Sequence, residues 1–389
     1  MADGAQDISA DSVTAEAVGA ISEVGQAAWD AVCDADPRPR DPFTRYAFLS
    51  AMEDSGSVRP GTGWAARHLV LKSAGDVIGV QPAYLKGHSQ GEYVFDHAFA
   101  DAYARAGGRY YPKMLGAVPF TPATGPRLIG SPEARRVLAD VGPRVAERSG
   151  VTGFAVNFPD ADDRAVLESA GYLIRSSQQY HFRDDGYGDW DGFLAALSSR
   201  HRKTLRKERA AIPAAGVEVR WLTGADITEA VLDDFWAFYQ DTGARKWGQP
   251  YLTRKAFSLL AERMADDLLF IMAYRGGRAI AGAMNVIGGD ALFGRYWGRT
   301  EHVDFLHFEV CYYQAIDFAL QRGLARVEAG AQGEHKVARG YAPVETHAAY
   351  WFADEGFRDA VAAYLRREAQ AVRSDMAYLG EFTPFRRGG

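Results

Sequence analysis

Residues 292–339 decide the fold expected for this chain; they read LFGRYWGRTEHVDFLHFEVCYYQAIDFALQRGLARVEAGAQGEHKVAR. Residues 291–297 and 325–329 are short apolar runs that each predict a strand. Between them, residues 305–322 predict a helix, because one apolar stripe recurs at helical spacing: Phe308, Cys311, Tyr312, Ala315, Ile316, Ala319 and Leu320. Gly323 follows as a stop signal. A strand, a crossover helix and a strand predict two parallel strands joined with right-handed topology.

The polar loop after the second strand, residues 330–341, is the first candidate for a functional site. It is rich in glycine and carries Glu334, His335, Lys336 and Arg339 within six residues. Two acid–base groups and two cations on such a loop do not fill a core. Loops held by a rigid sheet often carry binding and catalytic residues, so we expect a site here.

Length and composition set the class of protein. The chain has 389 residues, 47% of them apolar and 24% charged, which is typical of a globular protein of two or three domains. A net charge of -6 argues against general nucleic-acid binding but leaves room for a local basic patch. We find no run of 18 apolar residues and no signal peptide, so we expect a cytoplasmic protein without a membrane span.

The sequence predicts neither a disulfide framework nor a metal site. The two cysteines, Cys33 and Cys311, lie far apart, and no Cys/His zinc spacing is present. Asp96, His97 and Asp101 could offer three ligands, but no fourth accompanies them. We therefore expect no bound metal.

The order of predicted elements occurs twice. Residues 68–85 and 268–287 each predict a hairpin around a glycine turn; helices precede each hairpin, and strand, helix and strand follow it. The first half opens with a helix expected over residues 15–32. We infer an α/β fold with mixed sheets, made of two copies of one unit over residues 15–186 and 187–389, after a disordered tail of residues 1–14.

Several motifs bear a resemblance to a known family. They are residues 88–97 (HSQGEYVFDH), 107–113 (GGRYYPK), 118–122 (VPFTP), 125–127 (GPR), 198–206 (SSRHRKTLR), 246–251 (KWGQPY), 294–298 (GRYWG), 307–309 (HFE) and 328–336 (EAGAQGEHK). With this element order, the chain resembles a tandem pair of GNAT acyltransferase folds. It is most similar to the FemAB-like, peptidoglycan-biosynthesis-like predicted N-acyltransferases of bacteria.

The resemblance implies acyl transfer, from either of two donors. Fem peptidyl transferases add amino acids to cell-wall precursors from charged tRNA, and Lys336 stands where their late Phe-Lys-x-x-Phe-Gly signature has its lysine. The long helical arm that many of them carry is not evident here. The other donor, acyl-CoA, is bound in GNAT enzymes by an Arg/Gln-x-x-Gly-x-Gly/Ala turn, and residues 298–302 (GRTEH) lack that pattern. Neither donor is a permanently bound cofactor.

The chemistry requires a base for an amine and a group that stabilises a developing oxyanion. His335 is the best-placed base, because an unperturbed imidazole titrates near neutrality. Glu309, in the first turn of its helix, and Lys336 complete the candidate catalytic set. Their alternative roles are a carboxylate favoured by the helix dipole and an ion-paired loop charge.

Candidate substrate-binding residues come from both halves of the chain. In the first half we expect them to line a cleft for an amide or sugar-bearing acceptor, or else to form a tyrosine-rich core; they are Asp96, His97, Tyr110, Tyr111, Lys113 and Arg127. In the second half, Lys246, Trp247 and Arg295 line the acyl channel or form cation–π contacts. Two residues of the polar loop, Glu334 and Arg339, are further candidates, and the alternative for Glu334 is a solvated or ion-paired loop charge.

The densest run of cations lies in residues 200–209 (RHRKTLRKER). On a helix, Arg202, Arg206 and Arg209 share one face, and arginine forks suit phosphate oxygens. A tRNA backbone, a diphosphate or a CoA tail could bind there. The alternative is a solvated helix face without a ligand.

Three functions therefore stay open from the sequence. The first is an acyl or aminoacyl transferase acting on a small-molecule or peptide amine, with charged tRNA as a donor. The second is an acyl-CoA-dependent N-acyltransferase. The third is a non-catalytic module that recognises a cell-wall precursor. The sequence gives no indication of the oligomeric state.

Overall fold

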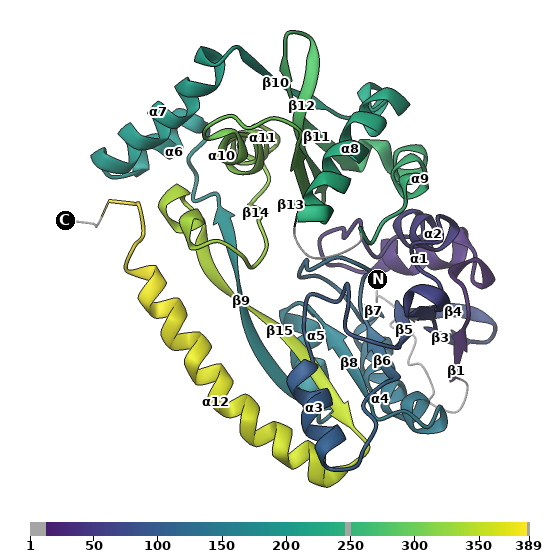
Figure 1. Cartoon of the computed structure of the whole chain (residues 1–389). Coiled ribbons are helices and arrows are strands. Elements are labelled where there is room, and N and C mark those ends of the chain that lie inside the picture. Colours follow the sequence, from purple (N-terminus) through teal and green to yellow (C-terminus); the bar gives the residue numbers. More distant parts are fainter. Residues whose placement is uncertain (1–12, 246–249, 387–389) are drawn as a thin grey trace, which may run out of the picture.

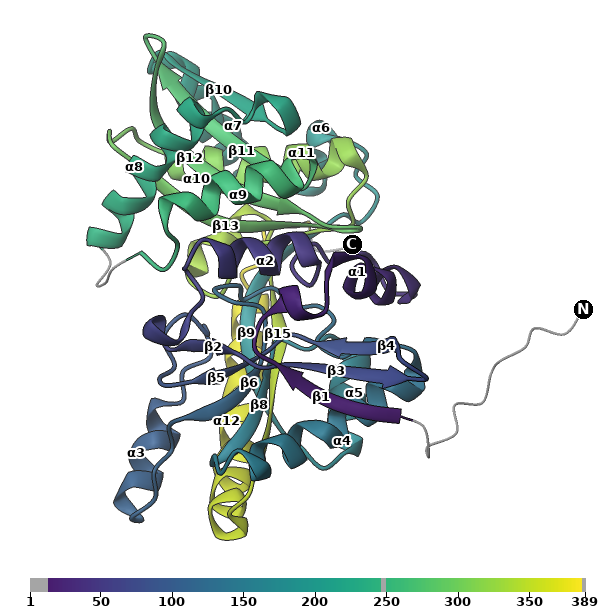
Figure 2. The ribbon, with the colours of Figure 1, turned by 90° about the vertical axis from the view of Figure 1, so that its right-hand side faces the viewer.

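The computed structural model describes residues 13–245 and 250–386, and its core is one sheet of 11 strands that runs through both halves of the chain. Its strand order is β10-β11-β12-β13-β14-β9-β15-β8-β6-β5-β2, and a second sheet has the order β1-β3-β4-β7. Figure 1 shows the two halves joined by the long strands β9 and β15, and Figure 2 shows the second sheet on the side of the first half.

The first half supplies the following elements: β1 (Val13–Val18), α1 (Gln26–Ala35), α2 (Tyr46–Asp54), β2 (Trp64–Ala66), β3 (His68–Ser73), β4 (Asp76–Gln81), β5 (Ala83–Lys86), α3 (His97–Arg105), β6 (Lys113–Gly116), β7 (Ile129–Gly130), α4 (Pro132–Arg148), β8 (Gly153–Asn157), α5 (Ala161–Ser169) and β9 (Leu173–Arg183).

The second half supplies α6 (Trp190–Ala196), α7 (Ser199–Ala214), β10 (Val217–Leu222), α8 (Glu229–Arg245), α9 (Arg254–Met264), β11 (Leu268–Arg275), β12 (Arg278–Ile287), β13 (Ala291–Arg299), α10 (Leu306–Phe308), α11 (Gln314–Arg322), β14 (Arg326–Glu328), β15 (Ala342–Phe352) and α12 (Glu355–Gly380). Two further segments matter for the site. One is a short stretch of π-helix (Glu309–Tyr313) between α10 and α11, which we call the π-turn, and the other is a 3-10 turn (Glu334–Arg339) before β15.

The strand–helix–strand unit expected from residues 291–329 is confirmed. β13 and β14 pair in parallel, from Ala291 opposite Arg326 to Phe293 opposite Glu328. The connecting helix differs in one respect, because Glu309–Tyr313, between α10 and α11, form a π-turn rather than regular α-helix. Such turns are rare and often lie at functional sites. The side-chain pattern did not reveal it, since the apolar stripe over residues 305–322 predicts a helix without distinguishing a π-turn within it.

The expected duplication is also confirmed. The hairpins β3–β4 and β11–β12 correspond, and each half contains a parallel pair joined through a helix: β6 with β8 through α4, and β13 with β14 through α11. This is a tandem GNAT-like fold.

The two units are interlocked rather than consecutive. β15, which follows the second unit in sequence, pairs antiparallel with β8 and with β9 of the first. α12 then lies along β9 and β15, at one edge of the molecule in Figure 1. A division at residue 186 therefore does not separate the strands by unit. No helix or strand was expected over residues 342–380, where β15 and α12 lie.

The helix expected over residues 15–32 is wrong in its first half. Val13–Val18 forms β1, which pairs with β3 from Val13 opposite Ser73 to Val18 opposite His68. Gly25 has φ of 82°, a conformation that favours glycine, and α1 begins only at Gln26. Pairing with a distant strand overrode the local helical spacing. The strand also places Val13 and Thr14 in the fold, outside the tail expected there.

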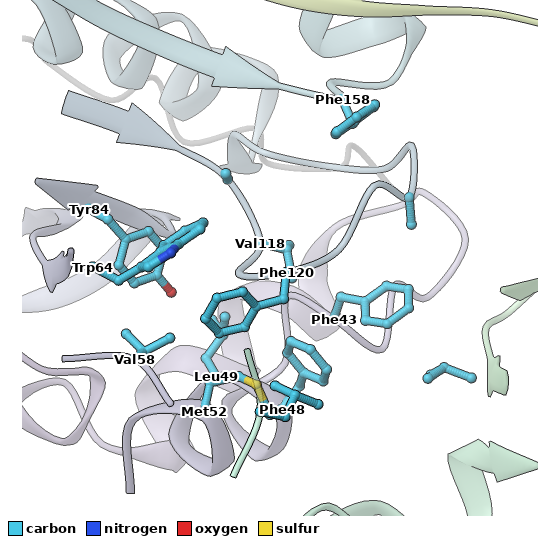
Figure 3. Close-up of a cluster of buried hydrophobic side chains, with 14 of the residues drawn as sticks. Phe43, Phe48, Leu49, Met52, Val58, Trp64, Tyr84, Val118, Phe120 and Phe158 are labelled. Atoms are coloured by element: carbon cyan, nitrogen blue, oxygen red, sulfur yellow. The ribbon is translucent and has the colours of Figure 1, made fainter. Parts of the chain in front are cut away.

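The largest hydrophobic core extends across both units. Phe43 contacts Phe48 of α2 on one side and Phe293 of β13 on the other, at ring-centroid distances of 5.2 and 5.1 Å. Figure 3 shows Phe43, Phe48, Leu49 and Phe120 in this cluster, with Trp64 and Tyr84 beside them. Burial of so many large apolar side chains across the junction fixes the two units relative to one another. In the described part of the chain, no helix is long and apolar enough to cross a membrane.

Candidate functional site

The parallel strands β13 and β14 part after Phe293 and Glu328. Beyond that point the chain after β14 joins β9: the amide of Ala329 donates to the carbonyl of Tyr180, and the amide of Tyr180 donates to the carbonyl of Gly330, both at 3.1 Å. β13 instead continues to Arg299 beside β12. The divergence forms a wedge whose backbone on the β13 side has no β14 partner.

Five side chains form an aromatic and imidazole cluster beside this wedge, which we call the His307–His335 cluster: Trp297, His307, Phe308, Tyr312 and His335. The ring centroids of His307 lie 4.9 Å from Trp297 and 6.1 Å from His335. Nε2 of His335 is 3.1 Å from the hydroxyl oxygen of Tyr312. His335 is exposed, so a substrate can reach its imidazole.

The protonation state of His335 suits a base. Partial burial lowers its pKa, and the positive charges of Arg339 and Lys336 lower it further. The imidazole is therefore neutral at pH 7 and able to accept a proton. Burial raises the pKa of Tyr312, so that its hydroxyl stays protonated beside the imidazole.

Lys336 places a cation where the two strands part. Its ammonium group donates to the carbonyls of Ala329 and Gly330, at 2.5 and 3.2 Å, directly after β14. It also lies 5.6 and 5.9 Å from the ring centroids of Tyr180 and Tyr312. Only 4% of the residue is exposed, so its charge acts in a low-dielectric environment.

Arg339 holds the turn that presents His335 and Lys336. Its guanidinium donates to both carboxylate oxygens of Glu208 on α7, at 2.9 and 3.0 Å, and to the carbonyl of His335 at 2.9 Å. It also stacks on Phe308 at 3.5 Å. These contacts make Arg339 a positioning residue rather than the substrate contact expected from sequence. Glu334, at the start of the same turn, is exposed.

Glu309 faces away from the His307–His335 cluster, toward α7. One carboxylate oxygen accepts from Gln314 at 2.6 Å and lies 3.3 Å from Nε of Arg209. Burial raises the pKa of this carboxyl, and the charge of Arg209 partly offsets the effect. The carboxylate of Glu309 therefore lies in a different environment from the imidazole of His335, and our proposal does not use Glu309 as the base.

The expected phosphate-binding arginines separate into two groups. Arg209 is engaged by Asp317 at 2.6 Å, by Glu309, and by the ring of Trp190 at 4.4 Å. Arg202 and Arg206 form no ion pair with any carboxylate among the described residues, and Arg206 is exposed. Phosphate binding stays a prediction for Arg202 and Arg206, whereas Arg209 forms ion pairs with Asp317 and Glu309 within the fold.

Three of the acceptor contacts expected in the first unit are buried instead. The ammonium of Lys113 pairs with Glu92 at 2.7 Å and with Asp96, and Asp96 also accepts from the hydroxyls of Tyr110 and Tyr350, at 2.8 and 2.7 Å. Asp96, Tyr110 and Lys113 are each at most 4% exposed. The cleft-lining interpretation is therefore wrong for these three, because a closed ion-pair network fixes β6 and β15 inside the core.

His97 and Tyr111, the other two expected contacts from this stretch, remain at or near the surface. His97 is exposed and stacks on Phe95 at 5.8 Å. Tyr111 is half-buried, with its hydroxyl 2.7 Å from that of Ser89. Acceptor binding stays a prediction for both residues.

The expected substrate contact of Arg127 is also wrong. Its guanidinium is 1% exposed and donates to the carbonyls of Asn157 at 2.9 Å, Pro126 at 2.9 Å, and Ala123. Asn157 is the last residue of β8. Arg127 therefore closes the end of the first unit's parallel pair and does not face a substrate.

Arg295 joins the two units rather than lining an acyl channel. It donates to the carbonyl of Phe120 and lies 3.4 Å from the hydroxyl of Thr121. Its guanidinium also stacks on Tyr296 at 5.3 Å. Lys246 and Trp247 lie outside the described residues.

The sequence did not indicate His307 or Tyr312 as candidate site residues, although both lie in the segment that was expected to decide the fold. Tyr312 was assigned to the apolar stripe, and nothing local shows that its hydroxyl reaches an imidazole. Tyr180, on β9, carried no signal at all, because it meets Lys336 only through the pairing of β9 with β14.

The class of protein follows from comparison with known families. The chain matches the FemAB-like model, described as peptidoglycan biosynthesis/recognition, over residues 20–387, and so belongs to the FemAB-like family. No curated protein sequence matches the chain.

Solved structures share the fold at low sequence identity. FemX is 13% identical, with a TM-score of 0.55 over 87% of this chain and 98% of its own. A conserved protein of unknown function from Bacteroides thetaiotaomicron VPI-5482 is 12% identical, with a TM-score of 0.51 over 85% of this chain and 98% of its own. L-PGS from Bacillus licheniformis is 9% identical, with a TM-score of 0.51 over 81% and 92%.

Proposed function

We propose that this protein transfers an aminoacyl group from an ester donor, charged tRNA, to an amine of a peptidoglycan precursor. The observation that carries the proposal is the neutral imidazole of His335 next to the buried ammonium of Lys336, where β13 and β14 part. Membership of a family described by peptidoglycan biosynthesis or recognition supports the acceptor class. Charged tRNA is a cytoplasmic donor, so we place the reaction in the cytoplasm.

The step needs no covalent enzyme intermediate. The acceptor nitrogen attacks the ester carbonyl, the new C–N bond forms, and the carbonyl oxygen gains negative charge. When Nε2 of His335 donates to Tyr312, Nδ1 carries the lone pair that takes the proton from the amine. The C–O bond to the ribose then breaks, and the proton leaves with the ribose hydroxyl.

Lys336 supplies the electrostatic part of this mechanism. A fixed cation in a low-dielectric site stabilises an oxyanion that develops beside it, without the reorganisation that water would need. Arg339 and Glu208 keep the turn in place, so that the cation and the base stay together.

The donor assignment rests on charge at two places. Arg202 and Arg206 on α7 offer cations to a phosphate backbone. The helix after β13, where a GNAT enzyme binds the pyrophosphate of CoA, is instead preceded by the carboxylates Glu301 and Asp304. Glu301 pairs with Arg275 at 3.1 Å and with Arg278, and Asp304 pairs with His302 at 3.1 Å. This arrangement does not fit a pyrophosphate.

The test is a transfer assay with three donors. Purified protein is incubated with a soluble UDP-linked muropeptide precursor and with charged tRNA, acetyl-CoA or long-chain acyl-CoA, and products are weighed by mass spectrometry. We expect a product heavier by one aminoacyl residue with charged tRNA only. Transfer from an acyl-CoA alone would contradict the donor, and saturable binding of the precursor without transfer from any donor would favour the recognition module.

A further inference from the structure

We propose that a second small-molecule site, for an organic cation, lies behind the π-turn, on the side away from the His307–His335 cluster. A cavity of about 510 Å³ opens there between α7, β10 and the π-turn. Its lining is Arg209, Ile212, Pro213, Gly216, Val217, Glu218, Val219, Glu309 and Gln314.

The indication of a ligand is an unsatisfied carboxylate oxygen in the cavity wall. Glu309 is 3% exposed, and its Oε1 is occupied by Gln314 and Arg209. Its Oε2 is buried and has no hydrogen-bond partner among the described residues. Buried polar atoms are nearly always paired in proteins, so an acceptor left open beside a cavity points to a donor from outside the chain.

The charges around the cavity select the class of ligand. Arg209 is the one guanidinium in the lining, and Asp317 neutralises it at 2.6 Å in addition to Glu309. The excess is therefore negative, which favours a cation over a carboxylate. Ile212, Pro213 and Val219 provide apolar contact for a short aliphatic part. A primary ammonium or a guanidinium on a chain of a few carbons fits both features.

This site is distinct from the wedge where we place the reaction. β11, β12 and β13 separate β10 from β14 in the sheet. Figure 1 shows β10 at the end of the second unit away from β9.

The π-turn connects the two places. Glu309 begins the turn, and Tyr312, three residues later, contacts His335. A ligand that binds Glu309 can therefore move the side chain of Tyr312 relative to His335. In this proposal the cavity is an effector site. The binding claim itself does not depend on the proposed function.

The experiment measures binding by ligand-observed NMR and by calorimetry on the full chain. The probes are n-butylammonium and n-butylguanidinium, with 1-butanol and butyrate as the neutral and anionic counterparts. We expect saturable binding of at least one of the two cations and at least tenfold weaker binding of 1-butanol and butyrate. Equal binding of 1-butanol, or tighter binding of butyrate, would overturn the proposal.

Two variants locate the binding. Glu309→Gln keeps the shape of the side chain and removes its charge, and should weaken cation binding at least tenfold. Val219→Trp fills the cavity without altering Glu309 and should abolish binding, while Ala210→Trp, at an exposed position of α7 outside the lining, should not. Circular dichroism checks that each variant is folded. Cation binding that survives Val219→Trp in a folded protein would reject this site.

The effector role has its own readout. Saturating cation should shift the imidazole signals of His335 in two-dimensional NMR of the wild-type protein. Signals that stay in place while binding saturates would reject the effector role.

Discussion

The two units share a strand–helix–strand pair but use its end in opposite ways. In the first unit, β6 and β8 are parallel, and the end of β8 is closed by Arg127, whose guanidinium donates to the last carbonyl of that strand. In the second, β13 and β14 part, and the chain after β14 carries Lys336 to the place where they separate. One copy thus closes the wedge with a buried cation that serves the fold, and the other keeps a buried cation beside an exposed base.

The same contrast holds for the buried lysines. The ammonium of Lys113 in the first unit pairs with the carboxylates of Glu92 and Asp96. The ammonium of Lys336 in the second unit donates to the carbonyls of Ala329 and Gly330. A lysine neutralised by two carboxylates cannot stabilise an oxyanion. The reaction we propose uses the cation of Lys336, so the comparison predicts that the second unit carries it.

The largest effect on stability should come from removing the guanidinium of Arg127 at the end of β8 in the first unit. Arg127→Met leaves three carbonyls without their donor and the buried carboxylate of Asp41, 3.8 Å away, without its cation. We expect a loss of about 3–5 kcal/mol in the free energy of unfolding, measured by urea denaturation. Arg105→Met, at an exposed position in the same unit, should cost less than about 0.5 kcal/mol. A stable Arg127→Met variant would show that the closure is not structural.

Removing the cation from the open unit should affect turnover. Lys336→Met should lower kcat about 100- to 1,000-fold, because it deletes the charge that stabilises the oxyanion. The matched change in the other unit, Lys113→Met, should instead destabilise the fold by about 3–5 kcal/mol, because it leaves two buried carboxylates. Quenched-flow or steady-state product measurement gives kcat, and thermal unfolding gives stability. The comparison fails if Lys336→Met unfolds the protein and Lys113→Met does not.

The proposed role of His335 as the base should appear in the pH dependence of the transfer rate. His335→Gln should lower kcat about 100-fold. In the wild type, burial and the charges of Arg339 and Lys336 lower the pKa of His335, so the active neutral form persists below the ordinary histidine range. The rate should therefore fall only as pH drops below about 6.5. An acid limb centred above that value, or one unchanged in His335→Gln, would assign the base to another residue.

The smallest effects should come from the basic face of α7. Replacing Arg202 or Arg206 with Ala should weaken charged-tRNA binding a few-fold each and reduce its salt dependence, because each change removes one phosphate contact. Filter binding at two salt concentrations measures this. Arg209→Ala should act mainly on stability, since Arg209 is held by Asp317 and Glu309. Equal losses of tRNA affinity for all three would contradict the division.

Much of the fold was predictable from local patterns. Residues 325–329 were expected as a strand and contain β14, and both hairpins lie within a few residues of their expected positions. The segments missed or misassigned, β1, β15 and α12, depend on partners far away in the chain. β1 forms because it pairs with β3, and β15 because it lies between β8 and β9.

The sequence by itself determined the parallel pair, its crossover helix and the polar turn with His335 and Lys336, because each depends on side-chain spacing over a few neighbouring residues. Only the tertiary structure decided which charged residues are buried against distant partners and which stay accessible. Asp96 meets Tyr350, Arg295 meets Phe120, and Lys336 meets Tyr180 only after distant strands have paired. Burial and the choice of partners are properties of the packed chain, so lysine and arginine hold the fold in the first unit, whereas in the second they lie at the site that we propose.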